Sequence, residues 1–186
     1  KQRPVIALTG SGGKTTIMFT LASELRQMGY SSIVTTTTAI FNPEHEPLDR
    51  LIIAPQFNMP QWPPVKPLIV VWGSRLTGGG KLLGVDVAAL LSKGVHEKMD
   101  CILVEADGSR QKPVKAPAQH EPKIPEGTTM VIGVVGLSAL GQRVSERSVP
   151  RFDHFCRVTD AVPGEMIKME HLFKLVLHPE GFFKQT

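Results

Sequence analysis

The 186-residue sequence contains little cysteine, few aromatic residues and no long apolar run. Its two cysteines are too few for a disulfide framework and, with six scattered histidines, they offer no metal-ligand spacing. The longest apolar stretch, residues 130–140, contains two glycines and is shorter than the roughly 20 residues that a membrane-spanning helix needs. These absences exclude a disulfide-rich scaffold, and we expect a cytoplasmic protein without a membrane partner.

Aromatic residues make up only 6% of the chain, and the net charge is a modest +4. The densest group of cations comprises only Arg110, Lys112 and Lys115, so we expect no nucleic-acid partner. Hydrophobic residues at 41% and charged residues at 20% are typical of a globular protein and exclude a disordered or fibrous chain. The length fits a single domain over residues 1–186.

The first 36 residues predict a βαβ unit. An apolar strand at residues 5–8 precedes a glycine-rich turn, an amphipathic helix at residues 15–28 and a second strand at residues 32–36. The apolar face of this helix is predicted to comprise Ile17, Met18, Leu21, Ala22, Leu25 and Met28.

The rest of the chain continues the same alternation. Apolar runs predict strands at residues 51–53, 68–72, 101–104 and 130–135. One helix is predicted to begin at Asp86, its N-cap, and to carry Val87, Leu90, Leu91 and Val95 on one face. A further helix is predicted between residues 165 and 177. Short, uniformly apolar strands are typical of a parallel sheet that is buried on both faces. The predicted fold is therefore α/β and P-loop NTPase-like, with a mainly parallel sheet flanked by helices on both faces.

The glycine-rich turn carries the strongest chemical signal. It comprises Thr9, Gly10, Ser11, Gly12, Gly13, Lys14, Thr15 and Thr16, and we predict that residues 10–16 bind a nucleotide. Glycines let backbone N–H groups converge on a phosphate chain, and the following helix adds its dipole. Lys14 is predicted to contact the β- and γ-phosphates as a catalytic residue, and the Thr15 hydroxyl to ligate Mg²⁺.

The turn departs from the usual P-loop at one position. Leu8 stands where a glycine is expected six residues before the lysine, which makes the loop a short G-x-x-G-K-T-T form. A structural glycine turn that happens to hold a lysine is the alternative. Because the loop is expected to be solvated, loss of the Lys14 side chain is expected to leave the fold intact.

Two carboxylates follow the strand at residues 101–104. Glu105 and Asp107 are two residues apart, so on extended chain they face the same side. Glu105 is predicted to hold Mg²⁺ directly or through water, and Asp107 to be a further metal ligand or a catalytic residue that orients the attacking water. A pair of solvated carboxylates at a strand end is the alternative.

Other polar residues are expected at the same edge of the sheet. Thr37 and Thr38 follow the second strand and are predicted to contact the γ-phosphate or a metal-bound water, although β-propensity with solvent-facing hydroxyls explains them equally well. Arg110, Lys115 and His120 lie in a polar loop, where each would serve either a substrate phosphate or only the solvated surface.

Taken together, the motifs resemble those of the YqeC family, accessory proteins of selenium-dependent molybdenum hydroxylases. The resemblance extends from residue 5 to about residue 181. It is carried by Leu8-Thr9-Gly10-Ser11-Gly12-Gly13-Lys14-Thr15-Thr16, Val104-Glu105-Ala106-Asp107-Gly108-Ser109, Lys115-Ala116-Pro117-Ala118 and His120-Glu121-Pro122. It implies a nucleotide-binding protein whose partner is a molybdenum hydroxylase or its cofactor machinery. The family's chains usually continue further, so a C-terminal portion is expected to be missing here.

The resulting prediction is Mg²⁺-dependent binding and hydrolysis of a nucleoside triphosphate. ATP is favoured over GTP, which is not excluded, because Asn42 and Asn58 are the only asparagines and no Asn-Lys-x-Asp guanine-reading motif is present. The loop also resembles the central domain of Mur-type ligases, which would imply activation of a carboxylate as an acyl phosphate. Two further functions fit the same motifs, namely a non-catalytic, nucleotide-gated partner protein and a kinase that acts on a small metabolite.

Overall fold

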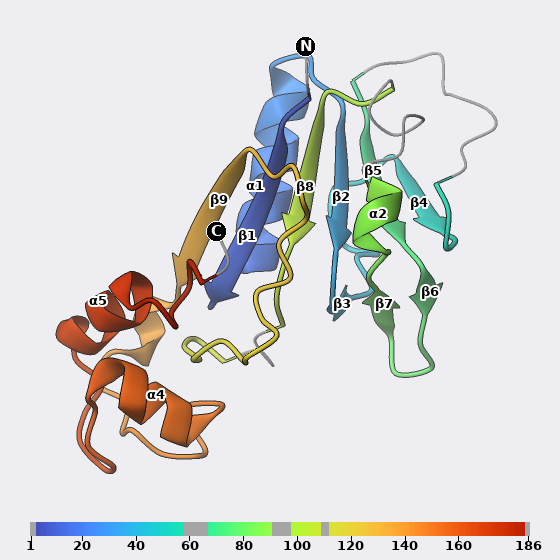
Figure 1. The fold of residues 1–186 in the computed structure, drawn as a ribbon. Coiled ribbons are helices and arrows are strands. Elements are labelled where there is room, and N and C mark those ends of the chain that lie inside the picture. The colour runs from blue at the N-terminus through green and yellow to red at the C-terminus, as the bar shows by residue number, and fades with distance from the viewer. Residues whose placement is uncertain (1–2, 58–66, 91–97, 109–111, 185–186) are drawn as a thin grey trace.

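A six-stranded sheet forms the centre of the computed structural model, which describes residues 3–57, 67–90, 98–108 and 112–184 (Figure 1). Every pairing in this sheet is parallel, and the order is β4-β5-β2-β8-β1-β9. The strands are β1 (Val5–Ser11), β2 (Ser32–Thr36), β4 (Arg50–Ile53), β5 (Ile69–Gly73), β8 (Cys101–Glu105) and β9 (Met130–Val135). The predicted α/β fold with a mainly parallel sheet is therefore confirmed.

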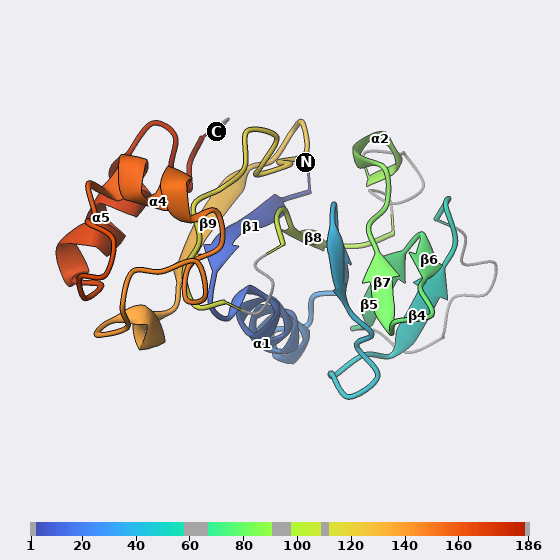
Figure 2. The ribbon, with the colours of Figure 1, turned by 90° about the horizontal axis from the view of Figure 1, so that it is seen from below.

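Helices lie on both faces of the sheet (Figure 2). α1 (Lys14–Gln27) packs against β1, β2 and β8, and α2 (Val87–Leu90) lies on the opposite face. Asp86 caps α2 as predicted, because its Oδ1 accepts a hydrogen bond from Ala88 N–H at 3.1 Å. The predicted continuation of this helix through Leu91 and Val95 lies outside the described residues.

A small helical unit lies beyond β9 (Figure 2). It consists of a 3₁₀ turn (Leu137–Ala139), α4 (Phe152–Thr159) and α5 (Met169–Leu177), and α4 and α5 pack on each other. α5 was predicted from the sequence, but α4, which has only eight residues, was not. In the described part of the chain, no helix is long and apolar enough to cross a bilayer.

A second sheet of three short antiparallel strands was not predicted from the sequence. It has the order β3-β7-β6, with β3 (Ala39–Phe41), β6 (Arg75–Leu76) and β7 (Lys81–Leu83). Strands of two or three residues are too short to leave a readable alternation. Backbone hydrogen bonds from Gly84 N–H to Thr38 O at 2.8 Å and from Val85 N–H to Thr36 O at 3.1 Å hold this sheet to the end of β2.

The face that α1 turns to the core differs from the prediction. Met18 and Ala22 are buried as expected, but Ile17 and Met28 are 37% and 69% exposed, and Phe19 is buried in their place. Lys14 lies four residues before Met18 and therefore on the same side of the helix. The rotation that buries the apolar face thus also directs Lys14 toward the sheet.

Candidate functional site

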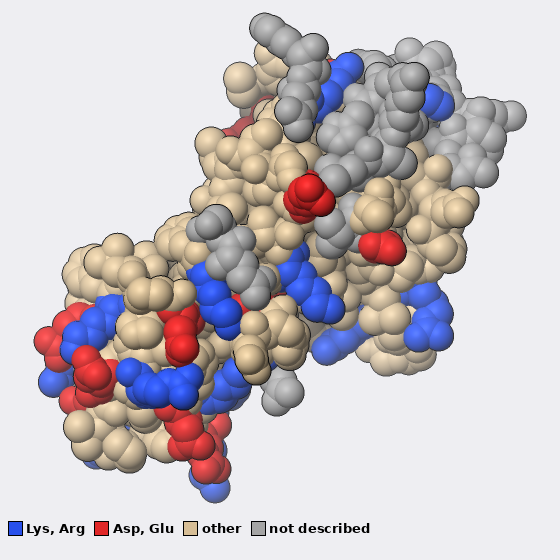
Figure 3. Space-filling model, viewed as in Figure 1, with Lys and Arg blue, Asp and Glu red and all other residues tan. Residues whose placement is uncertain are grey.

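The predicted site residues meet at the carboxyl ends of the central strands. Glu105, the last residue of β8, lies level with Leu8 of β1 and Thr36 of β2 in the sheet register. These strands end at the lower edge of the sheet in Figure 1, and in the lower half of Figure 3 Lys and Arg side chains are interspersed with Asp and Glu, many of them over the α4 and α5 unit. This edge is where open parallel sheets bind their ligands.

The glycine loop is tightly packed behind and open in front. Gly12 and Gly13 have φ values of +82° and +116°, which L side chains rarely adopt. A Cβ on Gly12 would lie 2.5 Å from the Cα of Gly136, whereas a Cβ on Gly13 would meet nothing within 4 Å. Gly13 therefore leaves space directly in front of α1.

The amino terminus of α1 retains unused hydrogen-bond donors. Its first helical hydrogen bond joins Ile17 N–H to Gly13 O at 2.9 Å, so the N–H groups of residues 14–16 precede the ladder. Within the described ranges no side chain caps this helix, and its first turn contains no acidic residue. Free N–H groups and the positive end of the dipole together suit an anion such as phosphate.

Lys14 does not project into solvent. Its side chain is 2% exposed, and its Nζ lies 2.9 Å from Asp107 Oδ1 and donates a hydrogen bond to Gly10 O at 2.7 Å. The expectation that Lys14 belongs to a solvated loop is therefore wrong, because the inward-facing start of α1 carries the ammonium beneath the loop. To reach a phosphate chain, the ammonium would exchange these partners for phosphate oxygens.

Asp107 is enclosed beneath the loop. It is fully buried, and its Oδ2 accepts hydrogen bonds from Gly10 N–H at 3.0 Å and Thr9 Oγ1 at 3.3 Å, with Lys115 Nζ 3.4 Å away. Lys14 Nζ lies 2.9 Å from the other oxygen, Oδ1, as an ion-pair partner, although Oδ1 accepts no hydrogen bond from the described residues. This enclosure argues against the predicted roles of Asp107 as a metal ligand and as the residue that orients water. Its position favours a role in holding Gly10 and Lys14.

Glu105 and Thr15 face each other across the front of the loop. The Thr15 hydroxyl donates a hydrogen bond to Glu105 Oε2 at 2.7 Å, and Lys14 Nζ lies 3.7 Å from Oε1. Burial raises the pKa of Glu105 above its usual 4.5, and Lys14 only partly opposes this shift. A cation beside this carboxylate would relieve the cost of burying its charge.

The Thr15–Glu105 pair fits Mg²⁺ only together with a ligand that brings further oxygens. Among the described residues, no group of three or more His, Cys, Asp or Glu side chains could hold a metal ion. Mg²⁺ is commonly bound by one or two carboxylates plus substrate phosphates, and phosphates held at α1 would supply the missing oxygens.

The threonines after Val34 differ in their contacts. Neither a shared role in phosphate binding nor shared exposure to solvent, the two interpretations of the sequence, describes all of them. Three of their hydroxyls donate to backbone carbonyl oxygens, from Thr35 to Trp72 at 2.7 Å, from Thr36 to Glu105 at 2.9 Å and from Thr37 to Lys123 at 3.0 Å. These bonds argue against the predicted contact between Thr37 and the γ-phosphate. Thr38 alone lines the cavity described below.

A chain of charges, buried except for its last member Arg151, continues from Asp107 away from the loop. Lys115 is 1% exposed, donates to Gly108 O and lies 2.9 Å from Glu121 Oε2. The same Glu121 oxygen lies 3.0 Å from Arg151 Nη2. Burial lowers the pKa of Lys115, whereas for Glu121 the neighbouring cations outweigh burial and hold its pKa below the usual value.

Two members of this chain of charges, Glu121 and Arg151, were not predicted from the sequence. Glu121 lies in the His120-Glu121-Pro122 motif, but no chemical role was predicted for it. Arg151 stands alone before α4, outside any motif, and adopts a φ of +56°. Of the three loop residues proposed from the sequence, Lys115 is buried in the network, His120 is exposed and Arg110 lies outside the described residues.

A cavity of about 520 Å³ opens beside the loop. Its walls come from the start of α1, the end of β2, the small sheet, the end of β8 and the segment before α4. The lining residues are Thr15, Thr38, Ala39, Ile40, Phe41, Lys81, Glu105, Gly108, Glu121 and Arg151. Thr15 and Glu105 therefore connect the cavity to the proposed metal position.

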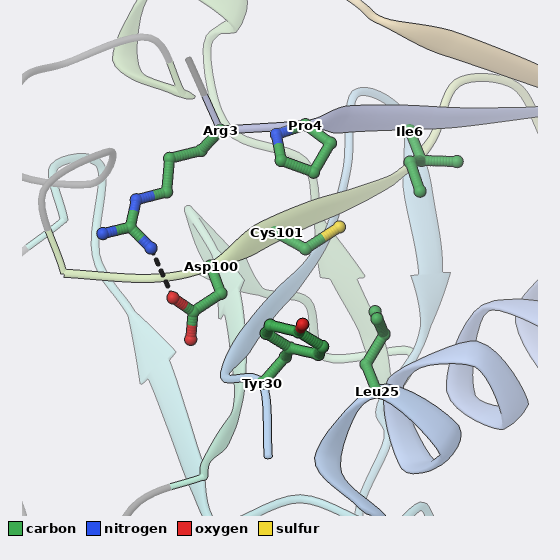
Figure 4. A pocket seen from close by; sticks show the side chains of 7 residues that line it. All are labelled: Arg3, Pro4, Ile6, Leu25, Tyr30, Asp100 and Cys101. Atoms are coloured by element: carbon green, nitrogen blue, oxygen red, sulfur yellow. Dashed lines mark hydrogen bonds and ion pairs between the residues drawn. The ribbon is translucent and has the colours of Figure 1, made fainter. Parts of the chain in front are cut away.

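A second cavity, of about 500 Å³, lies at the opposite, amino-terminal ends of β1 and β8 (Figure 4). It is mainly apolar, and the ion pair between Arg3 and Asp100 borders it. Burial raises the pKa of the Cys101 thiol in its wall to about 11, which leaves the thiol protonated and unreactive at neutral pH. This cavity shares no lining residue with the one beside the loop.

Comparison with known proteins agrees with the motifs. A family model described as YqeC protein matches residues 6–153. The chain is also 36% identical, over 187 residues, to the "Uncharacterized protein YqeC" of Escherichia coli (strain K12), and the match covers 100% of this chain and 72% of that relative. No solved structure matches the chain.

Proposed function

The chain belongs to the YqeC family, and we propose that it binds a nucleoside triphosphate, ATP in the first place, together with Mg²⁺ and hydrolyses it. The observation that carries this proposal is that the uncapped amino terminus of α1 adjoins the Thr15–Glu105 pair, whose oxygens lie 2.7 Å apart, with the Lys14 ammonium 3.7 Å from Glu105. A purely structural glycine turn has no need for all three features together.

Each residue has a defined task in the proposed reaction. The N–H groups at the start of α1 hold the phosphate chain, and Lys14 moves from Asp107 to the β- and γ-phosphates. Thr15 and Glu105 hold Mg²⁺, which when bound neutralises the charge of the phosphate oxygens. Asp107 keeps Gly10 in place and receives Lys14 again after the phosphates leave. Because these groups position and neutralise charge, they suit phosphoryl transfer.

The biological setting is proposed from family resemblance. The sequence motifs around Glu105 and His120 resemble those of accessory proteins of selenium-dependent molybdenum hydroxylases. We therefore place the nucleotide-binding activity in the maturation of such an enzyme, with the hydroxylase or its cofactor machinery as partner.

Thermal unfolding with ATP, GTP, CTP and their diphosphates, each with and without Mg²⁺, tests the binding step. A ligand at 100 times its dissociation constant stabilises the folded state by about 2.7 kcal/mol, which corresponds to roughly 5–10 °C for a chain of this size. We expect such a shift for one nucleoside triphosphate, dependent on Mg²⁺.

Two variants test whether the Mg²⁺ dependence of the thermal shift comes from Glu105. Glu105→Gln is expected to abolish the Mg²⁺ dependence, whereas Glu24→Gln, which removes an exposed carboxylate on α1, is expected to leave it unchanged. No shift with any nucleotide would mean that the loop is structural, and the proposal would be wrong. A shift without phosphate release would favour a nucleotide-gated binding protein over a hydrolase.

A further inference from the structure

We propose that the cavity beside the loop binds the acceptor of the terminal phosphate, and that this acceptor is a small molecule with a flat apolar body and an anionic oxygen as its nucleophile. The inference rests on the proposed nucleotide site, which it extends from hydrolysis to transfer. It would make the protein a phosphotransferase that acts on a carboxylate or a phosphate ester.

The position of the cavity separates it from the phosphate-binding loop. Residues 10–14 are not among its lining residues, whereas Thr15 and Glu105 form one of its walls. In P-loop sites the threonine and the metal lie beside the β- and γ-phosphates. The cavity therefore begins where the terminal phosphate would end, which is the position an in-line acceptor requires.

The wall opposite Glu105 is built by the small antiparallel sheet. Phe41 and Lys81 are register partners on β3 and β7, and Lys81 Nζ lies 5.5 Å from the centre of the Phe41 ring. Phe41 is 52% exposed, a large aromatic surface for a residue that lines a cavity. A flat apolar body packed on the ring edge would bury this surface and place its anionic group within reach of the ammonium.

The lining holds two cations, Lys81 and Arg151, and two carboxylates, Glu105 and Glu121, and the two cations keep donors that an anion could use. Lys81 is exposed and forms no ion pair with a carboxylate of the described residues, so its ammonium is open to an anion. The contacts of Arg151 with Ala116 O at 3.1 Å and with Glu121 occupy two of the five donors that a guanidinium offers. These two cations flank a volume of about 520 Å³, within the range that holds small ligands.

The same lining explains why the nucleophile must already be an anion. The cavity has two carboxylates, and both are committed, Glu105 to Thr15 and the metal position and Glu121 to Lys115 and Arg151. Among the residues that the structure describes, no histidine lines it. A hydroxyl acceptor would therefore lack a base to take its proton.

An acid anion needs no base. Its oxygen forms the new bond to the terminal phosphorus while the bond from that phosphorus to the bridging oxygen breaks. The diphosphate leaves with the electron pair, and no proton has to move. A carboxylate acceptor yields an acyl phosphate, and a phosphate ester yields a substituted diphosphate.

Binding of model anions tests the assignment. Benzoate, phenyl phosphate and the neutral control benzyl alcohol are titrated, by ligand-observed NMR, into the protein alone and into the protein with Mg²⁺ and a non-hydrolysable ATP analogue. We expect at least one of the two anions to bind in the presence of the analogue and benzyl alcohol to bind much more weakly. The anion that binds identifies the acceptor as a carboxylate or a phosphate.

Three variants locate the bound anion. Lys81→Gln is expected to weaken binding at least about tenfold, the usual effect of losing a hydrogen bond to a charged group. Phe41→Leu is expected to weaken it roughly threefold to tenfold through loss of the aromatic contact. Arg75→Gln, which removes an exposed cation from the same hairpin outside the cavity, is expected to leave binding unchanged.

The outcomes separate the two proposals. Equal binding of benzyl alcohol, an unaltered affinity of Lys81→Gln, or displacement of the anion by the ATP analogue would each overturn the acceptor site; displacement would show that the cavity belongs to the nucleotide itself. Failure of the ATP analogue to bind, with the anion still sensitive to Lys81→Gln, would instead overturn the nucleotide proposal and the acceptor role while leaving an anion site.

Discussion

Replacement of Asp107 or Glu105 by the matching amide distinguishes a structural carboxylate from a metal-binding one. Asp107→Asn and Glu105→Gln each remove one negative charge with almost no change of shape, and the two positions are only two residues apart. Any difference between the variants therefore reports their surroundings. We expect Asp107→Asn to lower the stability of the free protein strongly and Glu105→Gln to leave it within about 1 kcal/mol of wild type.

The cost at Asp107 follows from its contacts. Removal of one partner from a buried ion pair typically costs about 3–5 kcal/mol. Here Lys14 keeps Glu105 at 3.7 Å and Lys115 keeps Glu121 at 2.9 Å, so neither cation loses all compensation. The lower end of the range, about 3 kcal/mol, is expected and corresponds to roughly 6–12 °C in melting temperature.

Glu105 behaves differently because burial raises its pKa. A raised folded-state pKa means that the folded protein holds the proton more tightly, so stability falls as the pH rises from the usual 4.5 through the folded value. In the absence of metal, the buried negative charge of Glu105 therefore destabilises the folded protein, and replacement by Gln removes that charge. Relative to wild type, Glu105→Gln should become more favourable as the pH rises over this window.

Thermal unfolding of both variants from pH 4.5 to pH 8, without nucleotide or Mg²⁺, provides the measurement. The same samples with Mg²⁺ and ATP should show the reverse sensitivity, with the ligand-induced shift lost in Glu105→Gln. If Asp107→Asn melts within about 1 °C of wild type, or if the two variants lose stability equally, the distinction drawn between these carboxylates is wrong.

Three further changes test other parts of the site. Lys14→Ala should abolish the nucleotide-induced shift and also destabilise the free protein, but by less than Asp107→Asn, since Asp107 keeps a second cation; unchanged melting would contradict the buried position of this lysine. Gly12→Ala should unfold or severely destabilise the protein, because its Cβ would meet backbone atoms at 2.5–2.7 Å. Gly13→Ala should cost only about 1–2 kcal/mol of backbone strain. Denaturant titration compares the free energies of unfolding of the two variants. The lowered pKa of Glu121 contributes stability that is present above its usual pKa of 4.5 and lost as the pH falls through the folded value, so Glu121→Gln should show a shallower loss of stability than wild type in acid-unfolding curves, and parallel curves would refute this role.

The loop, its flanking strand and helix, and the strand that ends at Glu105 could all be predicted from the amino-acid sequence. These features are local, since the glycines, Lys14 and Thr15 are contiguous and an apolar run followed by a carboxylate can be recognised within six residues. The parallel sheet follows from the alternation of such units, because parallel neighbours require a crossover between them. The carboxyl ends of the strands then had to meet at one edge.

Which charged groups are buried, and what they contact, could not be predicted from the sequence and depends on the folded arrangement. Spacing alone placed Glu105 and Asp107 on the same side of the chain and predicted both to be near the metal, but the rotation of α1 brings Lys14 onto Asp107 and leaves Glu105 facing Thr15. The Lys81–Phe41 wall joins residues 40 positions apart on strands too short to leave a pattern. Such contacts depend on how distant segments pack, and no local periodicity encodes them.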